Sequence, residues 1–408
     1  MSNDKKPAIR FKDYSDDWEQ RKLENILSLE NGFAFQSEYF VEEKTGYVVA
    51  TPGNVSVEGG FICEGGKNYS VSAPFNERFI FKSGDIFVTM TDLTPTANTL
   101  GKPAIVPDNG IIYLHNQRLG KLVDYNCNKK FLFALLCTDK YHSQIVKTAS
   151  GTTVRHSSPD KILSYETFVP KFEEQKMIGK FFSNLDHFIA LHQRKYDKLQ
   201  NLKKAMLKKM FPKNGSNVPE IRFKGFTDAW EQRKFGDIGS VAMCKRIFKE
   251  QTDEEGEVPF YKIGTFGGEP DAFISRELFD EYKLNYPYPN KGDILISASG
   301  SIGRTVEFTG KDEYFQDSNI VWLKHGNKID NSFLKVLYGV VEWSCEGSTI
   351  KRLYNDNFLK TEFMLPRIEE QIKLGEYFSN LDNLIALHQR ELEKLKNIKK
   401  AMLEKMFV

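Results

Sequence analysis

Apolar residues in two stretches of the chain, residues 173–211 and 369–408, recur in alternating steps of three and four. This spacing places them on one side of a helix and is typical of a coiled-coil seam. Pro170 and Pro366 precede the two stretches and cannot occupy a helix interior, so they predict where the helices begin. We therefore predict two long helices that pack against each other. Their seam positions are Phe182, Leu185, Ile189, His192, Leu199, Phe378, Leu381, Ile385, His388 and Leu395.

The second stretch repeats the first. Residues 173–211 and 369–407 are identical at 26 of 39 positions, and residues 9–23 and 221–235 at 10 of 15 positions. His192 and His388 occupy equivalent seam positions, where a shared metal is one interpretation. We favour the interpretation that both histidines are polar residues that set the register of the seam.

The residues between the repeated blocks differ from each other and predict strands more than helices. Short apolar runs follow the Gly84-Asp85 and Gly292-Asp293 turns, and short helices are expected at residues 129–142 and 331–343. We therefore predict an α+β protein in which one helical frame is used twice around two dissimilar, strand-rich modules. The expected boundaries are 1–172 (first module), 173–211 (first long helix), 212–220 (linker), 221–368 (second module) and 369–408 (second long helix).

Composition narrows the class of protein. The chain has 408 residues, a net charge of +2 and five cysteines without a paired spacing, which predicts two domains of a soluble, cytoplasmic protein. Its N-terminus lacks the apolar core of a signal peptide. The net charge is too small for a protein that binds DNA only by neutralising phosphates. Local basic patches or a basic partner must therefore support any nucleic-acid function.

Three pairs of matched polar segments lie in the modules. Gly101-Lys102 aligns with Gly303-Arg304, and residues 151–156 align with 347–352, where small hydroxyl residues precede two basic ones. An amide-rich segment follows in each module, at residues 116–118 and 316–319. Arg, Lys, Asn and Gln donate to phosphates and read base edges. The candidate DNA contacts are Lys102, Gln117, Arg118, Arg155, His156, Arg304, Gln316, Asn319, Lys351 and Arg352.

Ordinary structural roles explain these segments about equally well, as turns or helix caps with solvated charges. Enzyme signatures are mostly missing: the chain has no GxGxxG, P-loop, GxSxG or HExxH motif. A nuclease-like PD…ExK pattern fits at Asp271…Lys283 and at Asp160…Lys176, and we regard both fits as chance. No catalytic or metal-binding residue is predicted.

The arrangement of the chain resembles the specificity subunit of type I restriction–modification systems, the HsdS family. The resemblance covers essentially the whole chain, and its most specific parts are the P-x-x-E-E-Q helix starts at Pro170 and Pro366. The F-S-N-L-D…I-A-L-H-Q-R segments and the W-E-Q-R-K blocks at Trp18 and Trp230 add to it.

The resemblance implies that each module is a target-recognition domain reading one half of a split, asymmetric DNA site. It implies an antiparallel coiled coil of the two helices that sets the spacing between the halves. The chain would be a non-catalytic subunit that docks modification subunits, two in number, and restriction subunits. S-adenosylmethionine, ATP and Mg²⁺ would belong to those partners, and this chain would bind no cofactor. The alternatives are a coiled-coil scaffold that never binds DNA and a divergent DNA methyltransferase or nuclease.

Overall fold

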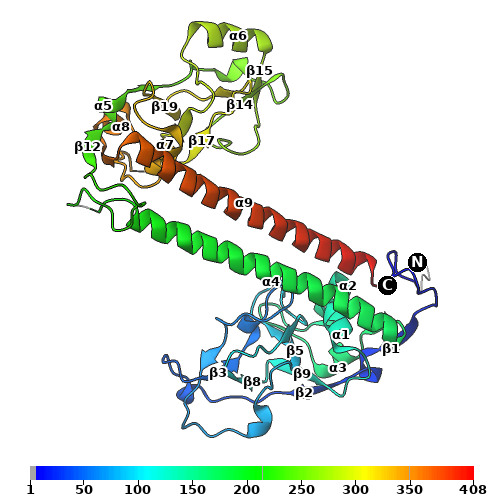
Figure 1. Cartoon of the computed structure of the whole chain (residues 1–408). Coiled ribbons are helices and arrows are strands. Elements are labelled where there is room, and N and C mark those ends of the chain that lie inside the picture. Colours follow the sequence, from blue (N-terminus) through cyan, green and yellow to red (C-terminus); the bar gives the residue numbers. More distant parts are fainter. Residues whose placement is uncertain (1–5, 214, 349) are drawn as a thin grey trace. The chain divides into compact units, whose positions relative to one another are not determined.

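The structure, a computed structural model, describes residues 6–213, 215–348 and 350–408, which form two compact units (Figure 1). Unit 1 comprises residues up to Gln193 together with Arg390–Val408, and unit 2 comprises Arg194–Gln389. Each unit holds one variable module and a part of each long helix. Residues 1–5, Asn214 and Thr349, which belong to the first predicted domain, the linker and the second hydroxyl-rich segment, lie outside the described residues.

The two modules have the same sheet topology. In unit 1 a four-stranded sheet has the order β2-β9-β5-β7 and a three-stranded sheet the order β4-β3-β8. In unit 2 the corresponding orders are β13-β19-β16-β17 and β15-β14-β18. The three-stranded sheets each contain one parallel pair, β3 with β8 and β14 with β18. Two modules with little sequence in common therefore share one strand arrangement.

The strands are short, and the central ones are apolar on both faces. All four residues of β5, and all four of β16, are buried, as their continuous apolar sequences predict. The strands of unit 1 are β1 (Glu19–Lys22), β2 (Ser28–Asn31), β3 (Tyr47–Ala50), β4 (Lys67–Asn68), β5 (Ile86–Thr89), β6 (Thr91–Asp92), β7 (Pro103–Ile105), β8 (Ile112–His115), β9 (Leu119–Val123), β10 (Arg155–His156) and β11 (Glu166–Val169). Those of unit 2 are β12 (Glu231–Lys234), β13 (Ser240–Ala242), β14 (Val258–Tyr261), β15 (Phe273–Ile274), β16 (Ile294–Ser297), β17 (Thr305–Glu307), β18 (Tyr314–Phe315), β19 (Ile320–Lys324) and β20 (Glu362–Leu365).

Short helices cover the sheets. The helix predicted at residues 129–142 is in fact two helices, because Thr138 caps the second one through a bond from the Tyr141 N–H to its hydroxyl. The helix predicted at 331–343 ends at Tyr338, before Gly339. The short helices are α1 (Lys129–Leu136), α2 (Asp139–Thr148), α3 (Pro159–Leu163), α5 (Phe235–Ile238), α6 (Arg276–Asn285), α7 (Asn331–Tyr338) and α8 (Asn355–Lys360).

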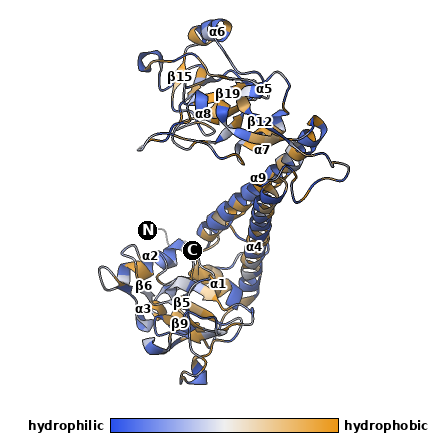
Figure 2. Cartoon of the chain, turned by 90° about the vertical axis from the view of Figure 1, so that its left-hand side faces the viewer, coloured by the Kyte–Doolittle hydropathy of each residue, from blue (hydrophilic) through white to orange (hydrophobic). Residues whose placement is uncertain are grey.

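The two predicted long helices are confirmed as α4 (Phe172–Lys209) and α9 (Ile368–Lys405), each of 38 residues. Figure 2 shows hydrophobic and hydrophilic residues interleaved along both of them. In unit 1 the beginning of α4 lies against the end of α9, and Lys399 pairs with Asp186 at 2.6 Å. In unit 2 the beginning of α9 lies against the end of α4, and Lys203 pairs with Asp382 at 2.5 Å. The helices are therefore antiparallel, as the resemblance implied.

The seam residues vary in burial. Phe182, Leu185, Phe378, Leu381 and Ile385 are buried, whereas the other five predicted positions are half-buried. His192 and His388, two of the half-buried positions, each interact with other residues of the chain. Across the described ranges, no group of three or more His, Cys, Asp or Glu residues is placed to hold a metal.

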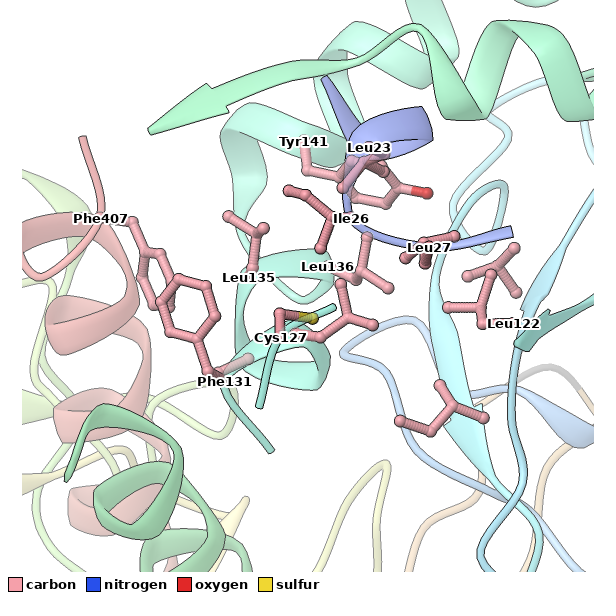
Figure 3. Packing of buried hydrophobic residues seen from close by; sticks show 14 of the residues in the cluster. Leu23, Ile26, Leu27, Leu122, Cys127, Phe131, Leu135, Leu136, Tyr141 and Phe407 are labelled. Carbon is pink, nitrogen blue, oxygen red and sulfur yellow. The ribbon is translucent and has the colours of Figure 1, made fainter. Parts of the chain in front are cut away.

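The core of unit 1 joins the module to both long helices. Figure 3 shows Leu23, Leu135 and Tyr141 of the module in the same cluster as Phe407, which follows α9. The ring centroids of Phe407 and Phe131 lie 5.5 Å apart. Among the described residues, no helix is long and apolar enough to cross a lipid bilayer.

Candidate nucleic-acid interface

The repeated block at residues 9–23 ties together the two long helices of unit 1. The backbone N–H of Ile9 donates to the carbonyl of Lys405 at the end of α9 (2.9 Å). Arg10 donates to both carboxylate oxygens of Glu174 at the beginning of α4, at 2.7 and 2.8 Å. The Glu174 side chain is only 1% exposed, and this hydrogen bond raises the pKa of Arg10. An arginine in this fork geometry suits a buried carboxylate.

The same contacts recur in unit 2. Ile221 donates to the Lys209 carbonyl at 2.9 Å, and Arg222 clamps Glu370 with two bonds of 2.7 Å. In both copies, the arginine of the I-R-F-K motif therefore binds the second glutamate of the E-E-Q motif.

The next residues of the motif hold the variable module. Gln175 accepts a bond from the Asn128 N–H (2.8 Å) and donates to the Pro170 carbonyl (2.9 Å), and Asn128 caps helix α1. Gln371 makes the same bonds to Asp330, which caps α7, and to Pro366. The glutamine that recurs in both copies thus fixes the position of a module helix against the long helix in each unit.

The three matched polar segments of each module meet at one strand end. In unit 1, Met90 donates its N–H to the Arg118 carbonyl (2.8 Å) and accepts from the Ser157 N–H (2.9 Å). In unit 2, Ala298 donates to the Asn319 carbonyl (2.8 Å) and accepts from the Leu353 N–H (2.8 Å). The sequence predicted the segments separately, and the structure brings them together in the same way twice.

The hydroxyl-rich segments form matching hairpins. Ser150 and His156 exchange two backbone hydrogen bonds in unit 1, as Glu346 and Arg352 do in unit 2. Gly151 and Gly347 have φ angles of +89° and +104°, and a Cβ atom there would lie 2.0 and 2.3 Å from a backbone oxygen. Only glycine fits these turns. The glycines are therefore structural, and the residues after them differ between the modules.

The loop that follows β5 in unit 1 is held from inside by Asp92. Its two carboxylate oxygens accept bonds from the N–H and hydroxyl groups of Thr94 and Thr99, at 2.6–2.8 Å. Burial alone would raise the pKa of Asp92, but these four bonds outweigh it and the pKa is lowered. The loop presents Leu93, which is 56% exposed.

The turn at residues 116–118 is supported by His115, which is 2% exposed. Its Nε2–H donates to the Leu119 carbonyl at 2.9 Å, and burial lowers its pKa to about 4. The Asn116 side chain accepts from the Arg118 N–H at 2.9 Å. Both bonds tighten the turn, which leaves the side chains of Gln117 and Arg118 exposed.

In unit 2 the converging segments border a hollow of about 690 Å³. Ser318, next to the predicted contact Asn319, lines it, together with the hairpin residues Glu346 and Arg352. Its remaining lining residues are Met243, Ala298, Leu353, Tyr354, Asn355, Asp356, Asn357 and Lys360. A polar concave surface of this composition can accept the edges of bases.

Lys102, a predicted DNA contact, is buried in this structure. The residue is 4% exposed, its ammonium group donates to the Cys137 carbonyl at 3.3 Å, and burial lowers its pKa. Gly101 lies against Ile145 of α2, so this end of the loop is covered. Lys102 is a buried anchor of the loop.

Three other candidates use their side chains within the protein. Arg304 donates to the Ile263 carbonyl at 2.6 Å, and Gln316 accepts from the Ile263 N–H at 2.9 Å. Arg155 is half-buried and donates to the Val146 carbonyl at 2.9 Å. These residues shape the candidate surface, and Arg304 remains exposed on it.

The remaining candidates are better placed for contact. His156 is exposed, with Nδ1 3.0 Å from the Thr91 hydroxyl. Within the described ranges, five candidates have side chains without a hydrogen-bond or ion-pair partner: Gln117, Arg118, Asn319, Lys351 and Arg352.

The nuclease-like patterns are not assembled as active sites. Asp271 pairs with Lys262 at 2.9 Å, whereas Lys283 pairs with Asp312 at 3.1 Å. Glu174 of the second pattern is the buried partner of Arg10.

Sequence reasoning missed the residues that organise the surface. Asp92 is marked by the T-D-x-T pattern, in which an Asp next to hydroxyl residues commonly fastens a loop. Glu346 directly precedes the matched Gly347 segment, and comparison with Ser150 in the other copy could have identified it. Met90 and Ala298 act through their backbones, which no sequence pattern reveals.

The chain is similar to a known protein family in sequence and to a solved structure in fold. A family model described as the type I restriction modification DNA specificity domain matches residues 15–201 and 227–397. A Haemophilus influenzae protein whose name is that of a type I restriction enzyme specificity subunit is 54% identical over 157 residues, 37% of this chain and 41% of that protein. The match therefore spans less than half of that relative.

Two further likenesses extend over most of the chain. The type I restriction enzyme MjaVIII specificity subunit of Methanocaldococcus jannaschii is 23% identical over 348 residues, covering 80% of this chain and 79% of that one. The crystal structure of a type I restriction-modification system S subunit from M. genitalium has a TM-score of 0.67 at 16% identity, covering 99% of both chains. The latter likeness establishes a shared fold.

Proposed function

Since the chain belongs to the family of type I restriction–modification DNA specificity proteins, we propose that it reads a bipartite, asymmetric DNA site. Each variable module reads one half-site, and the length of the two conserved helices sets the number of unread base pairs between the halves. The chain contributes recognition, and the chemistry belongs to its partner subunits.

One observation supports this proposal most directly. In each module the amide-rich segment and the residue after the hydroxyl-rich segment bond to one residue, Met90 or Ala298. The third segment bonds to the residue before it, Gly101 to Thr89 or Gly303 to Ser297, yet the side chains of the segments differ between the modules. Ser150 and His156 in one hairpin correspond to Glu346 and Arg352 in the other. Identical scaffolds with different exposed groups are suited to reading two different sequences.

Exposed apolar residues on the conserved helices support docking of partner subunits. Phe188 and Leu191 of α4 are 50% and 36% exposed, and the equivalent Leu384 and Leu387 of α9 are 45% and 51% exposed. Residues of this kind on an otherwise polar helix mark interaction surfaces. Because the pattern occurs once in each copy, we propose two modification subunits per chain.

Partners complete the assembly. The modification subunits would bring S-adenosylmethionine, and the restriction subunits would bring ATP and Mg²⁺. The small net charge of +2 fits this division, because partners can supply much of the phosphate contact.

Methylation mapping tests the proposal. The chain is expressed together with its modification subunit in a host free of other methylases, and methylated positions are read by sequencing. The expected result is one motif with two fixed halves around a spacer of constant length. Replacing residues 24–150 with those of a related module should change one half only.

A scaffold that never binds DNA predicts another outcome. In that case methylation would be absent or would show no motif, and replacing a module would alter nothing. A chain that methylated DNA without any partner would instead favour the enzyme alternative.

A further inference from the structure

Glu346 and Arg352 stand directly opposite each other in the second module. The Glu346 N–H donates to the Arg352 carbonyl (3.0 Å), and the Arg352 N–H donates to the Glu346 carbonyl (2.8 Å). Residues that exchange both bonds in an antiparallel pair have Cα atoms about 5.5 Å apart and side chains on the same face. A carboxylate and a guanidinium therefore project side by side.

Both groups border the hollow of about 690 Å³ and are exposed. The Asn357 side chain donates to Glu346 Oε1 at 2.8 Å, which orients the carboxylate and leaves Oε2 available. Within the described part of the chain, the Arg352 guanidinium has no hydrogen-bond or ion-pair partner, and the Glu346 carboxylate accepts its bond from Asn357 and forms no ion pair with Arg352.

The backbone of Arg352 is fixed on both sides. Lys351 and Leu353, its two neighbours, bond to Gly300 (3.1 Å) and Ala298 (2.8 Å), so that Arg352 lies between Glu346 and Ser299. A side chain on a backbone held in this way is positioned well enough to discriminate among ligands.

The chemistry of the pair matches one kind of base pair. In the major groove guanine offers two acceptors, O6 and N7, which arginine binds with two donors, whereas cytosine offers the N4 amino donor, which a carboxylate accepts. We infer that Glu346 and Arg352 read one G·C pair in the half-site of the second module, with Glu346 on the cytosine N4 amine and Arg352 on the guanine. This inference rests on the proposed function and deepens it.

The first module differs at this point. Ser150 and His156 occupy the equivalent positions, and His156 Nδ1 is already 3.0 Å from the Thr91 hydroxyl. A serine lacks the carboxylate that selects the cytosine amine. The carboxylate–guanidinium pair therefore distinguishes the second half-site from the first.

The test compares Glu346→Ala, Arg352→Ala and wild-type chain, each assembled with the modification subunit, by methylation mapping. Glu342→Ala, an exposed glutamate outside the hollow, is the matched control and should leave the motif unchanged. We expect Glu346→Ala to lose preference at one cytosine position of one half-site by about 5- to 150-fold, the range for one good base contact. Arg352→Ala should relax the guanine of the same pair.

A duplex carrying N4-methylcytosine at that position supplies a second readout. Wild-type complex should bind it more weakly than the unmodified duplex, and the Glu346→Ala complex should bind both equally. If Glu346→Ala abolished all methylation, weakened binding of the N4-methylated duplex by wild-type complex would still support the inference. Equal binding at every cytosine of the half-site would overturn it.

Two outcomes distinguish a failure of the base-pair assignment from a failure of the proposed function. If wild-type complex methylates a bipartite motif but Glu346→Ala leaves every position unchanged, the inference is wrong and the proposed function stands. If wild-type complex shows no motif, the proposed function itself fails.

Discussion

His115 shows how a buried group supports an exposed reading turn. Its imidazole is 2% exposed and donates to the Leu119 carbonyl, and its ring centroid lies 4.6 Å from that of the tilted Phe81 ring. The turn carrying Gln117 and Arg118 therefore depends on it. The pKa is lowered to about 4, so the folded state holds the neutral form.

This lowered pKa predicts a pH dependence. In the unfolded chain the histidine binds a proton below about pH 6.5, whereas in the folded chain it does so only near pH 4. The stabilising contribution is therefore complete above pH 6.5 and is lost as the pH falls toward 4, by about 3 kcal/mol in total. His115→Gln keeps the donor and removes the titration. The difference in unfolding free energy between wild type and this variant should narrow from pH 7 to pH 4, and a constant difference would contradict the assignment.

Substitutions at Lys102 and Arg118 compare a buried basic residue with an exposed one for their effects on DNA recognition. Lys102→Met replaces a buried cation with an apolar chain of similar length, so half-site recognition should be unchanged. Arg118→Ala removes an exposed guanidinium and should weaken one half-site by about 5- to 150-fold. Binding of the assembled complex to duplexes altered in one half-site at a time measures both. Loss of recognition in Lys102→Met with unchanged stability would restore the original prediction.

The burial of Lys102 could not be read from sequence. Its alignment with Arg304 rests on a Gly-basic dipeptide, but the first module has six extra residues before it and a second helix, α2, over it. Long-range packing of Ile145 against Gly101 decides the exposure. By contrast, Gly151 and Gly347 were predictable, because their role depends on local backbone conformation.

At the scale of elements, the long helices were the most predictable part. A seam repeated over 38 residues leaves few alternatives, and the observed ends differ from the predicted ones by at most three residues. The division of residues 129–142 into α1 and α2 was missed, since the cap at Thr138 competes with continuing helical periodicity.

Gly179 and Gly375 mark where a module helix meets a long helix. A Cβ atom on Gly179 would lie 2.6 Å from the Phe131 nitrogen, and one on Gly375 would lie 2.7 Å from the Phe333 nitrogen. Alanine in a helix normally gains about 1 kcal/mol over glycine. Here the clash with backbone should reverse the sign, and we expect Gly375→Ala to lower the unfolding free energy by about 1–3 kcal/mol.

Denaturant unfolding of the full chain measures this effect. Gly179→Ala should act in the same direction, because the same contact recurs in the other unit. Ser183→Ala, at a half-buried helical position near Gly179, serves as a control for helix propensity. A stabilising effect of either glycine substitution would show that the module helices are free to move away.

At the scale of the whole molecule, the chain closes on itself within unit 1. Residues up to Gln193 and residues from Arg390 onward form one compact unit, and Ile9 bonds to Lys405. The I-R-F-K block therefore has one role in both copies, which is to join the end of one long helix to the beginning of the other. The duplication is visible in the sequence. Only the tertiary contacts show that the end of each long helix packs in the unit that holds the beginning of the other.

The duplicated frame predicts how spacing can be changed. Seven residues inserted after Gln193 and seven after Gln389 would add one heptad to each helix at equivalent positions, so the antiparallel seam keeps its register. Each helix grows by about 10 Å, at roughly 1.5 Å per residue. With base pairs about 3.4 Å apart, the methylated motif should keep both half-sites while its spacer lengthens by about one to three base pairs.

An insertion in one long helix alone distinguishes the effect of helix length from the effect of packing between the helices. Seven residues after Gln193 alone leave α9 too short to match α4, so the seam loses contacts and methylation should fall. The doubly inserted chain should regain methylation at the longer spacer, because its two helices match again. If it methylated only the original spacing, the helices would not determine the separation of the half-sites, and the modules would have to reach them by another route.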